Sequence, residues 1–326
     1  MNILCTPLHG ISDRDFCSTG HTWYFLQMQK WGLGWQYYIS EKPDNAIMID
    51  ALNFPFSNPV CWSTTLLKEH YIEKLNIDLV LAPGIEFCYM AMHWDYPIIQ
   101  YCNLIFDDEY GRGWLRYLKK SHPEIPIVFH NRVNAELSGM KEEDYILIPR
   151  GYEISGIPWQ GTKEKALIAF NSMRQRMGHF NFVFRYQGLK YNLGDQLDLV
   201  GYGNEEFGAE GVRTQELRNL FSQYRVVINI DHWPGRGMLE AMASGVPVVS
   251  YIRDDVKKYG ENGTHYYMSD NLTDIVRITK GLLNNKERAR IIGENGKELV
   301  RKFFSKKDYI MRWNELFKQV VERNKQ

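Results

Sequence analysis

The sequence lacks the features that mark secreted, disulfide-stabilised or strongly charged proteins. Its 326 residues include only five cysteines, all in the first third of the chain, and no two of them form a CxxC pair. An odd number of unpaired thiols favours free cysteines in a reducing compartment over a disulfide framework. Lys plus Arg equals Asp plus Glu at 39 each. This balance excludes a bulk electrostatic attraction to nucleic acid or to an anionic membrane, although a local patch stays compatible with it.

Long apolar runs are also missing. No run reaches the roughly 18 residues that a membrane span needs. The first residues, MNILCTPLHG, have neither the basic start nor the long apolar core of a signal peptide. We therefore expect a cytoplasmic protein, with peripheral attachment at the inner membrane face as an open alternative. Repeats and low-complexity segments are absent as well, so the chain is expected to fold as ordinary globular domains.

Short apolar runs alternate with helical segments along the whole chain, a pattern typical of parallel sheets covered on both faces. In the first half, 12–20 is interpreted as a polar loop, and 22–31 and 64–75 as helices. The predicted strands there are 1–5, 35–40, 46–51, 77–82, 97–102, 125–130 and 145–149. In the second half the predicted strands are 166–170, 197–200, 226–230 and 246–251, and the predicted helices are 214–223, 237–244, 272–283, 287–304 and 307–321.

A stretch containing Pro and Gly, 149–161, separates the two series and is interpreted as a linker. The length of the chain suits two domains of ordinary size. The sequence therefore predicts an N-terminal domain over 1–154 and a second doubly wound domain over 155–306.

The segment 230–250, IDHWPGRGMLEAMASGVPVVS, carries the clearest chemical pattern. A buried strand ends, a loop containing Gly turns into a helix, and Gly245 ends that helix before the next strand. Unpaired amides at the helix start, near Gly235, Gly237 and Met238, would face an anion. Glu240 lies one turn into the helix, where its carboxylate can accept hydrogen bonds from two hydroxyls. On the residues alone, the segment equally fits a structural strand–loop–helix–strand unit of any α/β protein.

The stretch LEAMASGVPVV resembles the donor-site signature of the GT-B glycosyltransferases, specifically retaining family 4. LDLVGYGN, LIPRGYE and STGHTWYFLQMQKWG are similar to that family's donor-flanking strand, linker entrance, and first Gly-rich loop with its helix, in the same order along the chain. The resemblance implies an α/β GT-B fold of two Rossmann-like doubly wound domains facing a cleft. It also implies that the last helix, 307–326, packs back on the N-terminal domain.

The resemblance further implies a sugar transfer from a nucleotide-diphosphate sugar, with retention and without a metal or another cofactor. Glu240 would hold the ribose. Arg174 and Arg176, in AFNSMRQRMGHF, would stabilise the departing diphosphate, although solvated loop arginines are the alternative. Gly201 and Gly203 would flank the donor. The remaining donor-site residues implied are Gly235, Arg236, Gly237, Met238 and Leu239, and on the acceptor side Thr19 and Gly20.

The chain departs from the family pattern at the first acidic residue of the signature. Eight positions before Glu240 stands His232, with Asp231 beside it. Either residue would then contact the transferred sugar. In the N-terminal domain, His130 and Asn103 follow predicted strands and are the other catalytic candidates, although a histidine after a strand often has only a structural hydrogen-bonding role.

The acceptor stays open: a glycan, a lipid, a small molecule, a protein or a modified nucleic acid all remain compatible with the sequence. The stretch 111–122, GRGWLRYLKKSH, mixes basic and aromatic residues that suit lipid headgroups or phosphates, although a solvated helix face explains it too. Two rival hypotheses are a non-catalytic GT-B protein that binds a nucleotide sugar or a protein partner, and another GT-B enzyme class. The neutral charge disfavours a nucleic-acid-binding module.

Overall fold

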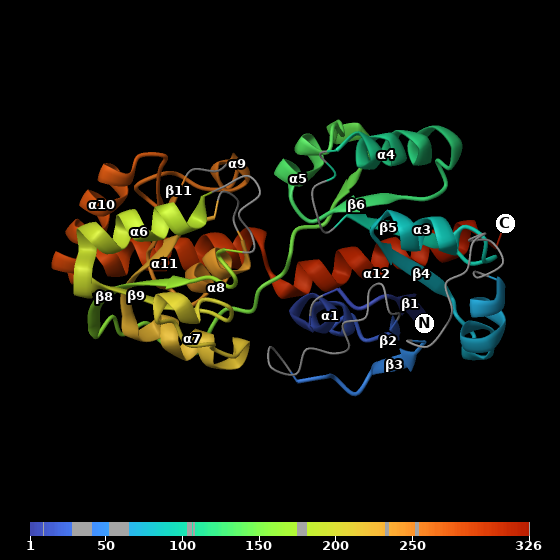
Figure 1. Ribbon diagram of the computed structural model, residues 1–326, viewed down its shortest axis with the longest axis horizontal. Helices are drawn as coiled ribbons and strands as arrows, with labels where there is room; N and C mark the ends of the chain where they lie inside the picture. The colour runs from blue at the N-terminus through green and yellow to red at the C-terminus, as the bar shows by residue number, and fades with distance from the viewer. Residues whose placement is uncertain are drawn as a thin grey trace. The chain divides into compact units, whose positions relative to one another are not determined.

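The chain divides into two compact units (Figure 1). The structure, a computed structural model, describes residues 1–8, 10–27, 41–51, 65–102, 106, 108–174, 181–231, 235–251 and 254–325. The first unit comprises Met1–Gly151 with Lys307–Gln326, and the second comprises Tyr152–Lys306. The division falls three residues before the boundary that the sequence predicts, and the C-terminal segment belongs to the first unit.

The first unit is built on a seven-stranded parallel sheet with the strand order β3-β2-β1-β4-β5-β6-β7. The order runs outward in both directions from β1 and β4, as in a doubly wound fold. Its strands are β1 (Asn2–Cys5), β2 (Thr22–Gln27), β3 (Ala46–Asp50), β4 (Leu79–Pro83), β5 (Ile98–Cys102), β6 (Ile127–Phe129) and β7 (Ile146–Leu147). Its helices are α1 (Gly10–Cys17), η1 (Lys68–Ile72), η2 (Glu73–Leu75), α3 (Ile85–Ala91), α4 (Glu109–Ser121), α5 (Arg132–Leu137), η3 (Glu142–Asp144) and α12 (Lys306–Arg323).

Alternate residues of these strands are buried on opposite faces of the sheet, because side chains point to opposite sides along a strand. One face packs against α3, α4 and α5 through residues such as Leu4 and Val80. The other face packs against α1 and α12, where Trp313 and Phe317 join Phe16 and Trp23 in an aromatic cluster. Helix α12, red in Figure 1, is therefore part of the core of the N-terminal unit.

Two predictions near the N-terminus are wrong. Residues 22–27 form the strand β2 instead of the start of a helix, and 10–17, mostly predicted as loop, form α1. The segment TWYFLQ is buried on both faces between β1 and β3, so its apolar residues do not alternate cleanly. Its aromatic side chains favour a strand in this setting. The polar composition of α1 hid a helix that buries Phe16 and Cys17 in the core together with the polar Ser12, Asp13 and Asp15.

The second unit contains a five-stranded parallel sheet with the order β12-β11-β10-β8-β9. Its strands are β8 (Lys163–Ala169), β9 (Leu197–Val200), β10 (Tyr224–Asn229), β11 (Val248–Tyr251) and β12 (Tyr267–Ser269). Its helices are α6 (Phe182–Leu193), η4 (Gly194–Gln196), η5 (Glu205–Phe207), α7 (Thr214–Gln223), α8 (Arg236–Ala243), α9 (Asp254–Lys257), α10 (Leu272–Asn284) and α11 (Lys286–Phe303). Helices α6 and α10 cover one face, whereas α7 and α8 cover the other.

The predicted linker 149–161 is mostly fixed to the second unit. Tyr152 exchanges backbone hydrogen bonds with Phe304 and Lys306, and the Ser155 amide donates to the Ala243 carbonyl. The Trp159 indole donates to the Tyr224 carbonyl at 2.8 Å. Buried polar backbone needs such partners, so most of this stretch is structured rather than a flexible connection. Within the described residues, no helix is long and apolar enough to cross a membrane.

Candidate functional site

The carboxyl end of the second sheet has the position where open α/β sheets bind ligands. Its strand order reverses between β8 and β10, and crevices form outside the carboxyl ends of strands at such a point. Helix α8 begins there, after β10. A Cβ built on Gly237 would lie 3.3 Å from the Ala169 carbonyl oxygen, so the start of α8 lies against the end of β8. The ends of β8 and β10 and the start of α8 therefore meet at one edge of the sheet.

The start of α8 offers backbone amides to a ligand. Gly235 is the N-cap in an extended conformation, and as a glycine it has no side chain that could cap the helix. The Met238 and Leu239 amides donate back to the Gly235 carbonyl, so the amides of Arg236 and Gly237 are the first of the helix. These groups and the positive end of the helix dipole favour an anion.

Asn229 holds this helix start against the ends of two strands. Its side-chain amide donates to the Ser250 hydroxyl at 2.9 Å and to the Asp231 carbonyl at 3.3 Å, and it contacts the Met238 sulfur at 3.8 Å. Asp231 is buried, two residues after the end of β10. Of the two sugar-contacting candidates that the sequence offers, Asp231 therefore lies at the carboxyl edge, and His232 lies outside the described residues.

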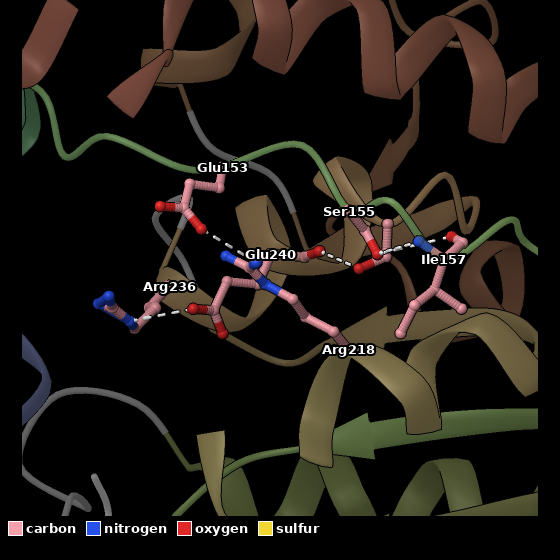
Figure 2. A network of polar contacts seen from close by, with 7 residues as sticks. Glu153, Ser155, Ile157, Arg218, Arg236 and Glu240 are labelled. Carbon is pink, nitrogen blue, oxygen red and sulfur yellow. Dashed lines mark hydrogen bonds and ion pairs between the residues drawn. The ribbon is translucent and has the colours of Figure 1, made fainter. Parts of the chain in front are cut away.

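Glu240 is buried and forms an ion pair with Arg236, one turn earlier on α8 (Figure 2). The Arg236 Nε lies 3.3 Å from a Glu240 carboxylate oxygen, and the side chains are 17% and 6% exposed. The Arg236 guanidinium also lies 5.9 Å from the centre of the Tyr152 ring. A buried carboxylate requires such a partner, since an unpaired charge is costly away from water. The pair places one positive and one negative charge beside the helix start. Nearby, Arg218 pairs with Glu153 at 3.4 Å.

Gly201 and Gly203 bring the loop after β9 against the loop after β8. Both have positive φ, +140° and +72°. A Cβ on Gly201 would lie 2.0 Å from the Phe170 carbonyl oxygen, and one on Gly203 would lie 2.7 Å from the Ser172 hydroxyl. Asn204, fully buried, bonds both the Phe170 carbonyl and the Met173 amide. The two glycines therefore have an evident packing role, and their donor contact stays a prediction.

Arg174 is held by an acidic partner in this structure. Its guanidinium makes two contacts with the Glu206 carboxylate, Nε at 2.8 Å and Nη2 at 2.6 Å. Both side chains are largely exposed, so the pair contributes little stability and exchanges readily with solvent or a ligand. Arg176 lies outside the described residues.

In the first unit, His130 follows β6 at the carboxyl edge of the sheet. Its ring lies 6.4 Å from the Tyr101 ring, and the Asn131 amide contacts its Nε2 at 2.9 Å. Burial lowers the pKa of His130 well below its usual value, and the charge of Arg150 lowers it further, with a smaller opposing effect from the Cys102 backbone. Burial also raises the pKa of Tyr101, against the effect of Arg150. A neutral histidine beside a cation results.

The other N-terminal candidates have different outcomes. Asn103 lies outside the described residues. The Thr19 hydroxyl donates to the Phe16 carbonyl at 2.6 Å and accepts from the Trp23 indole at 3.3 Å. The Thr22 amide donates to the Met1 carbonyl, so Thr19 and Gly20 lie at the amino ends of β1 and β2. Ligands of such sheets bind at the opposite ends, which argues against an acceptor-side role for these two residues.

Comparison with known proteins identifies this architecture. Residues 174–317 match a family described as "Glycosyl transferase-like". The chain resembles a glycosyltransferase from Rickettsia africae, with 14% identity, TM-score 0.68 and 98% of both chains covered. It also resembles the Anabaena protein HepE solved with UDP-glucose, with 12% identity, TM-score 0.73, and 98% of this chain and all of that one covered.

The chain also resembles the sucrose-phosphate synthase from Thermosynechococcus elongatus, with 12% identity, TM-score 0.72, and 99% of this chain and 100% of that one covered. The chain has the GT-B glycosyltransferase fold. A search of curated protein sequences finds no match. The α/β GT-B prediction is thus confirmed, whereas assignment to retaining family 4 stays a prediction. Among the described residues of this GT-B protein, no group of three His, Cys, Asp or Glu side chains gathers in a way that would hold a metal.

Sequence reasoning missed several polar residues at these two sheet edges. Arg150 directly follows a predicted strand, a position that could have marked it. Tyr101 lies inside the apolar run PIIQYC, where its hydroxyl gave no signal. The ion-pair partner of Glu240 could have been found, because Arg236 precedes it by four residues on a predicted helix.

Proposed function

We propose that this GT-B protein transfers a sugar from a nucleotide-diphosphate sugar to an acceptor hydroxyl or amine, with retention at the anomeric carbon and without a metal. The observation that carries the proposal is the start of α8, where backbone amides and the buried Glu240 lie together at the switch point of the second sheet. The match of residues 174–317 to glycosyl transferase-like proteins supports it. So does the fold shared with HepE, which was solved with UDP-glucose.

In this hypothesis each group acts on a different part of the donor. The Glu240 carboxylate accepts hydrogen bonds from the ribose hydroxyls. The amides of Arg236 and Gly237 bind the diphosphate. When the bond between the anomeric carbon and the diphosphate oxygen breaks, the nucleoside diphosphate keeps the electron pair. The fixed positive ends of these amides stabilise that charge without reorganising.

A donor screen tests the proposal. UDP-, GDP- and ADP-sugars are added to the wild-type chain and to Glu240→Gln, and the melting temperature is recorded. Glu240→Gln keeps the size of the side chain and removes its charge. A ligand that binds only the folded state stabilises it by about 2.7 kcal/mol at a hundredfold excess over Kd. We expect one donor class to stabilise the wild type and the variant to respond less; no response to any donor at millimolar concentration would refute the donor site.

Transfer itself is checked separately. With the donor found above, a panel of sugar, lipid and peptide acceptors is screened for release of the nucleoside diphosphate. NMR of the product gives the anomeric configuration, and the same reaction with EDTA gives the metal requirement. Inversion would contradict retention, and a rate abolished by EDTA and restored by Mg²⁺ would contradict metal independence.

A second function is favoured by two observations. Position 232 carries His where the resembling signature has its first acidic residue, and Arg174 forms an ion pair with Glu206. Both fit a non-catalytic GT-B protein that binds a nucleotide sugar or a protein partner. In that case the donor stabilises the chain, and no acceptor panel releases nucleoside diphosphate above the rate of hydrolysis in water.

A further inference from the structure

Arg185 brings a positive charge to the carboxyl edge of the second sheet from a helix that the signature does not include. It lies in the first turn of α6, after the N-cap Asn181. Its Nη1 donates to the Ile230 carbonyl at 2.8 Å, directly beyond the end of β10. Its guanidinium carbon lies 4.2 Å from the centre of the Tyr251 ring, at the last residue of β11. Arg185 therefore lies over the carboxyl ends of two adjacent strands.

The Tyr251 ring is a platform for this guanidinium. A planar guanidinium close to an aromatic face is held by the ring's negative potential. Tyr251 is 4% exposed, and its buried hydroxyl has no hydrogen-bond partner among the described residues. Because the Tyr251 hydroxyl has no such partner, it is the ring of Tyr251 that positions the guanidinium. The geometry fixes the direction of the Arg185 side chain toward the edge where Asp231 follows Ile230.

We propose that Arg185 is a phosphate-binding residue of the donor site, oriented by the ring of Tyr251. This inference rests on the proposed function and adds to it the residue that binds the diphosphate. A guanidinium matches the oxygens of a phosphate with paired N–H donors, which a single ammonium does not. Arg174, the residue that the sequence pointed to, is engaged by Glu206 in this structure. Arg185 lies against the end of β10, the strand that leads into α8, and the first amides of α8 would bind the same diphosphate.

The test separates the phosphates from the rest of the nucleotide. Isothermal titration measures binding of UDP, UMP and uridine, and of the matching GDP and ADP series, to the wild type and to Arg185→Ala. We expect Arg185→Ala to weaken binding of the preferred nucleoside diphosphate about tenfold to hundredfold, the loss of one charge-assisted contact. Binding of the nucleoside should stay within about twofold of wild type. Equal affinity of both chains for the diphosphate would overturn the proposal.

Four more variants make the result specific. Arg185→Lys should keep part of the affinity that Arg185→Ala loses, because lysine has the positive charge but not the paired N–H donors of the guanidinium. Tyr251→Phe keeps the ring and should bind the diphosphate like the wild type, whereas Tyr251→Leu should weaken it. Arg290→Ala removes an exposed arginine of α11, paired with Glu287, and controls for net charge. A similar loss in Arg290→Ala, or nucleoside binding that falls as much as diphosphate binding in Arg185→Ala, would show that Arg185 has no specific phosphate role.

Failure of the inference and failure of the proposed function give different results. If the wild type binds no nucleotide, the donor site itself is refuted. If the wild type binds a nucleoside diphosphate and Glu240→Gln weakens the nucleoside while Arg185→Ala changes nothing, the donor site stands and Arg185 is only a structural residue that holds the end of β10.

Discussion

The two units of the chain build the carboxyl edges of their sheets in different ways. In the unit 152–306, the helix start, its acidic residue and the acidic residue after β10 all come from one segment, 229–240. In the other unit, the polar group at the edge combines Tyr101 of β5 with His130 after β6 and Arg150 after β7. A site made of contiguous residues leaves a readable signature. A site assembled by the sheet does not, because its members share no spacing along the chain.

The units also differ in what completes their cores. The second unit is continuous in sequence, whereas the first needs α12 from the far end of the chain. Trp313 of α12 is 1% exposed and lies 5.4 Å, centre to centre, from Phe16 and 5.2 Å from Phe317. The first unit therefore closes its core only after the second has been synthesised.

The largest expected loss of stability comes from a substitution in the contiguous site of the second unit. Glu240→Ala removes the buried carboxylate that pairs with the partly buried Arg236. Breaking a buried ion pair costs about 3–5 kcal/mol of folding free energy. Because the two units have separate cores, the loss is measured in the second unit alone, by hydrogen exchange of β8 and β10 peptides at increasing urea in the wild type, Glu240→Ala, Arg236→Met and Glu240→Leu/Arg236→Met. The double variant should lose much less than either single one. A loss below about 1 kcal/mol in Glu240→Ala would show that the pair is not buried as described.

A similar loss of stability is expected from a substitution in the core of the first unit, which α12 completes from the far end of the chain. Trp313→Ala removes a large buried side chain and should cost the first unit about 3–5 kcal/mol. Because the units have separate cores, two-state analysis of the whole chain does not apply. Hydrogen exchange resolved by peptide should show faster exchange in β1 and β4 and unchanged exchange in β8 and β10. Equal acceleration in both sheets would contradict independent cores; Met311→Ala, at an exposed position of α12, is the control.

A smaller effect is expected at the glycine loop of the second unit. Gly201→Ala places a Cβ 2.0 Å from the Phe170 carbonyl at φ +140°, so the loop must move. The backbone conformation alone costs about 1–3 kcal/mol. Gly208→Ala is the matched control, because its φ is +74° and no atom lies within 4 Å of the built Cβ. Melting temperatures should fall more in Gly201→Ala; equal shifts would show that the close approach to β8 carries no cost.

The smallest expected effect is a pH dependence of the stability of the first unit. The pKa of His130 is lowered in the folded chain, so the unfolded chain binds the proton more tightly. The contribution of His130 to the free energy of unfolding is complete above its pKa in the unfolded chain, about 6.5. It declines as the pH falls below that value, by about 1.4 kcal/mol per pH unit at most, until the lower pKa of the folded chain is reached. His130→Gln should flatten this decline. His21 is shifted in the same direction, so His21→Gln serves for comparison, and an unchanged slope in His130→Gln would contradict the assignment.

Much of the second unit could be predicted from its sequence. The helix 214–223 is found as predicted, and α8 begins one residue before its predicted start. Helix α8 is bounded by Gly235 and Gly245, and the helix 214–223 has apolar residues at helical spacing, so local patterns suffice. In the first unit the same reasoning placed a helix over β2. Its aromatic residues are buried from both sides, and only the neighbouring strands decide that they are extended.

The sequence by itself determined the alternation of strands and helices, the glycine-bounded start of α8 and the position of Glu240 one turn into it, because these depend on residues close together in the chain. Only the tertiary structure decided which charges meet. It paired Arg174 with Glu206, gathered Tyr101, His130 and Arg150, and set Arg185 on the ring of Tyr251. Most of these contacts join residues far apart in sequence, and parallel strands bring them together at one edge regardless of their separation.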